Sequence, residues 1–207
     1  MYNKIIRSRR KTIGLEVREN AEVVLRLPWG AKQNDIDRFL QKNAGWIERA
    51  KKKVLEREKC VSGIEFRVGS YVPYLGMSYP LGTLIGSVSE EKGKEGFILW
   101  AKEEAKRIFA SYAEIHAKKA GKAYSGIRIT NAKKRWGSCS SKDTLSFAWR
   151  LILGPLWVLD YVMAHEVAHL IHRNHGKRFW KKVEILYPDY KKARKWLKHH
   201  GHLLTIK

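Results

Sequence analysis

The chain has 207 residues, 44% of them hydrophobic, which is enough for one large domain or two small ones with a real core. It shows no apolar N-terminal stretch and no uninterrupted apolar run of membrane-spanning length, so we expect no membrane association. Two cysteines, Cys60 and Cys139, cannot form a disulfide framework, which predicts a reducing, cytoplasmic location. The compositional outlier is charge, with 42 Lys and Arg against 20 Asp and Glu, a formal net charge of +22.

Residues 1–100 are expected to form an N-terminal α+β region with a small antiparallel sheet and a helix. Alternating apolar residues on both sides of a turn near Glu19-Asn20 predict an antiparallel hairpin that follows a basic segment. The alternating residues are Ile13, Leu15 and Val17, then Val23, Leu25 and Leu27, and the basic residues are Arg7, Arg9, Arg10 and Lys11. From Asn34 the apolar spacing indicates a helix with a break near Gly45. Short β-like runs between glycines in residues 64–100 predict strands continuous with the same sheet.

Residues 101–207 form the second half, and the boundary is soft because no linker-like segment precedes it. Its first expected elements are an amphipathic helix over 101–120 that ends at Gly121, a strand around 127–129 and a strand over 145–151. Arg150 would point away from the apolar side of the last strand. We therefore expect it to face either a cleft or solvent.

The segment His165-Glu166-Val167-Ala168-His169 lies in a mainly apolar stretch that follows Pro155, where a helix readily begins. On a helix, histidines four residues apart share one face, about 6 Å apart along the axis, so both rings can reach one ion. Glu166 projects about 100° around the helix, from where it can hold a metal-bound water without being a ligand. Such a polar set would be costly to bury unless a metal ion satisfied it. The pattern indicates a zinc hydrolase.

Two histidines compete for the place of third ligand. His172 would lie on nearly the same face one turn further along, whereas His175 reaches the ion only if the chain turns after His169. Asn174 and Gly176 tolerate the left-handed backbone that ends a helix. Because a ligand from outside the helix suits tetrahedral geometry better, we favour His175. His172 would then line the cleft or hold a carboxylate that orients a ligand.

The chain after Gly176 is expected to form a helix behind the metal-binding helix, interrupted at Pro188, and a last helix from Tyr190 to His200. Nine basic residues crowd this region, with aromatic residues between them. They are Lys177, Arg178, Lys181, Lys182, Lys191, Lys192, Arg194, Lys195 and Lys198. Such a face could neutralise phosphates and release counterions, which predicts non-specific association with nucleic acid or another polyanion. A solvated lysine-rich helix would show the same composition.

Several segments together resemble the YgjP-like metallopeptidase family, a relative of the SprT-like and other zincin-type peptidases. They are Arg10 to Ile13, Trp46-Ile47, Arg135 to Ser140, Trp149 to Ile152, His165 to His169, and Asn174-His175 with Phe179-Trp180. The resemblance spans almost the whole chain and implies an α+β fold with a zincin-like metallopeptidase core, which we place in residues 101–207. It also implies one zinc ion per chain, with His165, His169 and His175 as ligands and Glu166 as catalytic base. SprT-like relatives act on proteins attached to DNA, which strengthens the polyanion expectation by resemblance only.

The sequence therefore predicts a zinc metallopeptidase acting on polypeptides. Glu166 would take a proton from the metal-activated water and pass it to the leaving amine. A sheet edge beside the zinc could hold an extended peptide by main-chain hydrogen bonds. The stabiliser of the oxyanion stays open among His172, Arg150 and Tyr187. Two alternatives also stay open: a zinc hydrolase of a non-peptide amide, and a nucleic-acid-binding module whose structural metal site uses His172 as a fourth ligand.

Overall fold

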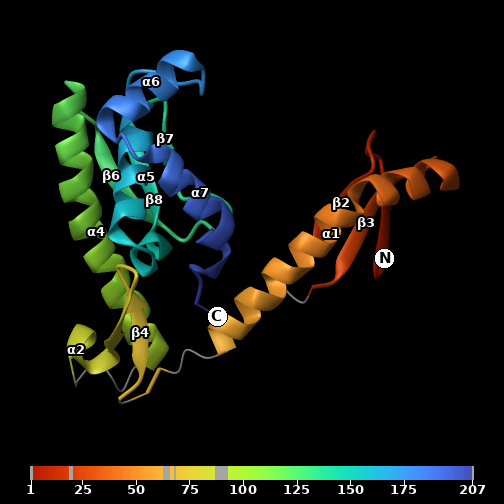
Figure 1. Ribbon diagram of the computed structural model, residues 1–207, viewed down its shortest axis with the longest axis horizontal. Coiled ribbons are helices and arrows are strands. Elements are labelled where there is room, and N and C mark those ends of the chain that lie inside the picture. The colour runs from red at the N-terminus through yellow and green to blue at the C-terminus, as the bar shows by residue number, and fades with distance from the viewer. Residues whose placement is uncertain (1, 19–20, 63–65, 68, 87–92, 207) are drawn as a thin grey trace. The chain divides into compact units, whose positions relative to one another are not determined.

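Two units of mixed helix and strand make up the chain, Met1–Gly63 and Ile64–Lys207. They come from a computed structural model that describes residues 2–18, 21–62, 66–67, 69–86 and 93–206 (Figure 1). The fold is α+β, as the sequence predicted. No helix in the described part of the chain combines the length and the apolar character that a membrane crossing requires.

A three-stranded sheet opens the first unit, in the order β1-β3-β2. β2 (Gly14–Val17) and β3 (Val23–Pro28) are antiparallel, with Leu15 opposite Leu25, which confirms the predicted hairpin. Its expected turn at Glu19-Asn20 lies outside the described residues. β1 (Lys4–Ser8) pairs with β3 in parallel, so the sheet is mixed rather than purely antiparallel. Because β1 is exposed at all but one of its positions, it lacks the alternation that marks a half-buried strand.

Helix α1 (Gln33–Ser62) packs on this sheet and continues through Gly45, where the sequence predicted a break. The shared core consists of Val23, Leu25, Leu27, Ile36, Leu40 and Ile47. A glycine costs a helix interior only about 1 kcal/mol relative to alanine. Burial of an apolar face on both sides of Gly45 is sufficient to offset that cost.

The second unit begins with the hairpin of β4 (Tyr71–Tyr74) and β5 (Met77–Pro80), followed by the short helix α2 (Leu81–Ile85). This hairpin is a separate sheet, which corrects the expectation that it continues the first one. Its turn packs against the segment before residues 156–168: the Leu75 amide donates to the Ile152 carbonyl at 2.7 Å. Gly76 has φ +83° and approaches Pro155 so closely that a Cβ would lie 2.8 Å from the Pro155 Cα.

Helix α4 (Gly93–Ala120) is the predicted amphipathic helix, although it begins at Gly93 rather than at 101. It ends at Gly121, whose φ of +64° is the left-handed conformation predicted for that position. His116, 2% exposed, faces helix α5 (Leu156–Ala168) from α4, and its Nε2 lies 2.5 Å from the Asp160 carboxylate. This pair joins the two helices.

A second three-stranded sheet has the order β6-β8-β7. β6 (Gly126–Thr130) is parallel to β8 (Thr144–Ala148), and the edge strand β7 (Gly137–Cys139) is antiparallel to β8. The expected strand over 145–151 ends at Ala148, because a 3₁₀ helix, η1 (Trp149–Leu153), follows. Arg150 is buried there, 8% exposed, and donates to the Asn131 carbonyl at 3.3 Å. It therefore does not face solvent.

Helix α5 lies in the middle of this unit, with α4 along one side and the C-terminal helices against it (Figure 1). These are α6 (Lys177–Leu186) and α7 (Tyr190–His200), and the 3₁₀ helix η2 (Gly201–Leu203) follows. Both helices and the interruption between them were predicted. Leu159, Met163 and Val167 of α5 are fully buried. The hydrophobic core thus fixes the helix that carries the motif.

Candidate metal centre

Three histidines converge at the end of α5. His165 comes from the helix, His169 is the residue directly after it, and His175 comes from the loop that follows. One nitrogen of each lies within 4.8 Å of the others, and the Nε2 atoms of His165 and His175 are 3.1 Å apart. Nitrogens bound about 2.0–2.1 Å from a tetrahedral zinc would lie roughly 3.3–3.4 Å from each other. The three side chains are therefore arranged closely enough for one ion.

The loop after α5 turns without the left-handed residue that the sequence suggested. α5 ends at Ala168, the following residue His169 still has helical backbone angles, and the His172 amide donates back to the Ala168 carbonyl at 3.0 Å. Gly176 has a φ of −77°, and Asn174 is not one of the described residues that have a positive φ. Instead, the Gly176 amide donates to the Asn174 carbonyl at 2.8 Å, which closes a tight turn with His175 at its centre.

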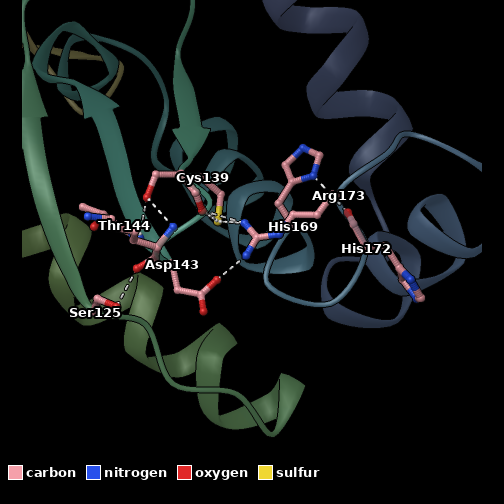
Figure 2. Close-up of polar contacts among 9 residues, drawn as sticks. Ser125, Cys139, Asp143, Thr144, His169, His172 and Arg173 are labelled. Carbon is pink, nitrogen blue, oxygen red and sulfur yellow. Dashed lines mark hydrogen bonds and ion pairs between the residues drawn. The ribbon is translucent and has the colours of Figure 1, made fainter.

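His172 contributes its backbone rather than its ring. The His169 Nδ1 lies 3.0 Å from the His172 carbonyl, and Figure 2 shows the His172 ring directed away from His169. A carbonyl only accepts hydrogen bonds, so Nδ1 of His169 must carry the proton and Nε2 keeps its lone pair. The structure thus brings His175, and not the side chain of His172, to the two histidines of the helix.

Aromatic side chains support the three rings. Phe179 is fully buried, and its ring centroid lies 4.4 Å from that of His169, 4.9 Å from His165 and 4.7 Å from His175. Trp180 lies beside His165 and His175, at 5.7 and 5.8 Å. Both come from the first turn of α6, and this helix therefore holds the histidine rings in place.

Burial favours the uncharged form of His165 and His169. Desolvation, with smaller contributions from the neighbouring histidines and Arg194, lowers the pKa of His165 to about 3. Desolvation also lowers the pKa of His169. A metal ligand must be the neutral imidazole, so the environment favours the form that binds a cation.

Glu166 lies beside these rings and is 5% exposed. Burial raises its pKa to about 8, and the charge of Arg135 opposes this shift. A divalent cation at the histidines would favour the ionised carboxylate. Gly137 of β7 leaves the room that this side chain occupies, because a Cβ there would lie 2.5 Å from the Glu166 Oε1.

These groups line a cleft of about 290 Å³. Its lining consists of Gly137, Ser138, Cys139, His165, Glu166, His169, Arg173 and His175. Strand β7 thus forms one side of the cleft, and α5 with its following loop forms the other. The sequence pattern located the histidines and Glu166, but it assigned no role in the site to Gly137, Ser138 or Arg173.

The sequence matches a family of metal-dependent peptidases, in agreement with the three converging histidines. A family model described as the YgjP-like metallopeptidase domain matches residues 11–88 and 83–200, nearly the whole chain. The chain belongs to the YgjP-like metallopeptidase family. A solved structure, the metallopeptidase zymogen abylysin of Pyrococcus abyssi, is similar with a TM-score of 0.40 and 22% identity, over 44% of this chain and 94% of its own. A comparison with curated proteins gives no match.

In this YgjP-like metallopeptidase, none of the three side chains expected to stabilise an oxyanion is found among the residues that line the cleft. His172 lines a neighbouring cavity formed by the loop after α5 and the start of α6. Arg150 is buried beside Trp149, whose ring its guanidinium covers at 4.9 Å. The Tyr187 hydroxyl donates to the Trp157 carbonyl at 2.8 Å. The cationic side chain that does line the cleft is Arg173.

Proposed function

We propose that this metallopeptidase uses one zinc ion per chain, held by His165, His169 and His175, to hydrolyse peptide bonds in polypeptides. The observation that carries the proposal is the convergence of the three histidine nitrogens beside the buried Glu166. Three neutral nitrogen donors with one position left open are the usual ligand set of a catalytic zinc. A zinc ion there would lower the pKa of a water to about 7 and polarise the scissile carbonyl.

The chain's own residues would move the proton and hold the substrate. Glu166 would accept the proton of the attacking water and pass it to the leaving amine. β7 is bonded to β8 on one side, with Ser138 opposite Ser146, and its other side borders the cleft. An extended peptide could add to that edge by main-chain hydrogen bonds, which would make cleavage tolerant of sequence.

The test is hydrolysis of a mixture of unfolded and DNA-bound polypeptides by the zinc-loaded protein and by a Glu166→Gln variant. Glutamine keeps the shape of the side chain but cannot act as a base, so hydrolysis should fall by about 10²–10⁴-fold. The zinc content and the circular dichroism spectrum should not change. Activity that survives within a few-fold would show that Glu166 is not the base.

The same experiment separates the two alternatives when a short acyl amide is added as a second substrate. A hydrolase of non-peptide amides would cleave a short acyl amide but no unfolded polypeptide. A nucleic-acid-binding module would hold its metal in a closed four-ligand site, without hydrolysing either substrate. The cytoplasmic location expected from the cysteine content is part of the proposal.

We also propose non-specific binding of a polyanion such as nucleic acid to α6 and α7. All nine basic residues named above except Lys182 are exposed. Arg194 covers the Trp180 ring at 4.7 Å, and Trp180 lies against His165, so this surface adjoins the metal centre. A polypeptide attached to DNA would thereby be held close to the cleft.

Retention on duplex and single-stranded DNA tests this binding. Between about 50 and 200 mM salt, several phosphate contacts should cost affinity on the order of 10³-fold or more. Charge reversal at Lys191, Lys192, Lys195 and Lys198 should flatten the dependence on salt. Reversal at Lys42, Lys51, Lys52 and Lys53 of α1 changes the net charge equally and serves as the control. Failure of the unmodified protein to bind at the lowest salt would reject the proposal.

A further inference from the structure

Arg173 lies in the loop between His169 and His175, and its guanidinium crosses the cleft to the opposite wall (Figure 2). Nη1 donates to the Ser140 carbonyl at 2.7 Å and lies 3.1 Å from the Cys139 Sγ. Nη2 donates to the Asp143 carboxylate. One side chain from the histidine-bearing loop therefore bonds both the end of the edge strand β7 and the turn that follows it.

The acceptors of Arg173 belong to a turn that has its own hydrogen bonds. Asp143 has φ +57°, a conformation that aspartate tolerates better than most residues. The Ser140 hydroxyl accepts from the Lys142 and Thr144 amides at 3.2 and 3.1 Å. The Ser125 hydroxyl donates to the Lys142 carbonyl at 2.6 Å, and the Ser125 amide donates to the Asp143 carbonyl at 2.9 Å. The turn is thus a well-defined anchor for the guanidinium.

On its own side of the cleft, Arg173 is next in sequence to His172, whose carbonyl fixes the His169 ring. His175 follows two residues later. Any displacement of Arg173 would therefore move the carbonyl that orients one histidine and the segment that presents another. The planar guanidinium, with several donors in fixed directions, suits such a link better than a lysine ammonium would.

We propose that Arg173 is a positioning residue that locks the histidine-bearing loop to the edge strand β7, so that metal binding and substrate seating depend on one guanidinium. The metal and substrate parts of this inference rest on the proposed function. The link itself does not. The side chains of Arg173 and Asp143 are 45% and 44% exposed, so their pairing adds little to global stability. Its effect should be local.

An Arg173→Met variant removes the donors while keeping much of the side chain's length. In the metal-free protein, hydrogen exchange should become faster at the amides of Ser140 and His172, which lie at the two ends of the link. Zinc affinity, measured by competition with a chelator, should fall about 10–100-fold, as is typical when support for a metal ligand is lost. The visible spectrum of the Co²⁺-substituted protein should change, and Tm should shift by no more than a few degrees. Arg128→Met, on the opposite edge strand β6, is the matched control and should change none of these.

Two further variants test the link from its other side. Asp143→Asn suits the left-handed backbone and removes one charged acceptor, so it should reproduce the same changes more weakly. Arg173→Lys keeps the charge and should restore only part of the zinc affinity lost in Arg173→Met. In the double variant Arg173→Met/Asp143→Asn, the loss of affinity should be smaller than the product of the single losses, because both variants break one contact.

The results separate this inference from the proposed function. Faster exchange on both walls with weaker zinc binding would support the lock. Exchange and zinc affinity unchanged within two-fold would overturn it, as would a change confined to KM or kcat, which would make Arg173 a substrate contact instead. If the unmodified protein binds no zinc, the proposed function fails, and the exchange measurement alone still decides whether Arg173 joins the walls.

Discussion

Helix α5 carries polar side chains at two places whose surroundings differ. The Asp160 carboxylate lies 2.5 Å from Nε2 of the buried His116 ring of α4, so each of these two groups has a protein partner, while Nδ1 of His116 has none among the described residues. His165 and Glu166, further along the same helix, and His169, which directly follows it, face a cleft and a third histidine. A buried polar pair with a protein partner stabilises the fold, whereas polar groups that converge on an open space indicate a ligand.

The sharpest way to break this comparison is to remove His165. His165→Ala leaves two of the three nitrogens, so we expect the protein to lose zinc at the concentrations that saturate the unmodified protein, and to lose hydrolysis with it. Metal analysis after dialysis and a peptidase assay measure this, and circular dichroism checks that the fold is kept. Retention of stoichiometric zinc would mean that the ion binds elsewhere.

A second prediction concerns the opposite wall of the cleft. In Gly137→Ala, the new Cβ would lie 2.5 Å from the Glu166 Oε1, so the carboxylate must move. We expect hydrolysis to fall about 10²-fold, near the lower end of a general base's contribution, while zinc content is retained. Gly126→Ala is the matched control, because nothing lies within 4 Å of a Cβ at that position. Equal activity of the two variants would contradict the proposed place of Glu166.

The third prediction concerns the other polar pair of α5. Asp160→Ala leaves the buried His116 ring without its carboxylate, so the free energy of unfolding should fall by about 1–3 kcal/mol. Zinc affinity should change by no more than about two-fold, because neither His116 nor Asp160 belongs to the histidine cluster. Urea unfolding and chelator competition measure the two quantities.

Glu114→Ala is the control for that measurement. Glu114 pairs with Lys118 at 3.4 Å on the exposed face of α4, and such a pair contributes only about 0.3–0.5 kcal/mol. A loss of zinc in Asp160→Ala without a loss of stability would show that the two polar places on α5 act as one, and the distinction between them would fail.

The sequence predicted well what helix geometry dictates. The spacing of His165, Glu166 and His169 and the end of α4 before Gly121 follow from local patterns. In the structure His165 and Glu166 lie on α5, His169 directly follows that helix with helical backbone angles, and α4 ends at Ala120. The choice between His172 and His175 as third ligand needed a further argument about the loop after the helix. The structure places His175 beside the rings of His165 and His169. That loop contains backbone hydrogen bonds from the His172 amide to the Ala168 carbonyl and from the Gly176 amide to the Asn174 carbonyl, and Gly176 lacks the left-handed conformation expected there.

What the sequence could not show depends on contacts between distant segments. Gly137 matters because Glu166 occupies the space in front of it, and Arg173 because the β7–β8 turn lies across the cleft. Neither position stands out by spacing or composition, although Gly137 lies in a segment that carried the family resemblance. β1 escaped notice because its exposure leaves no alternation. Residues 149–153 form a 3₁₀ helix that is buried at every position, although the alternation in the sequence predicted a strand as far as residue 151.

The smallest effect is expected for His172→Ala, which separates a backbone role from a side-chain role. The His172 carbonyl orients His169, and alanine keeps that carbonyl, while the lost ring belongs to the neighbouring cavity. Zinc affinity and hydrolysis should therefore change by no more than about two-fold. His175→Ala, which removes one of the clustered nitrogens, should weaken zinc binding by far more. The reverse order, measured by the same chelator competition, would make His172 the third ligand and would require the loop to adopt another conformation when the ion binds.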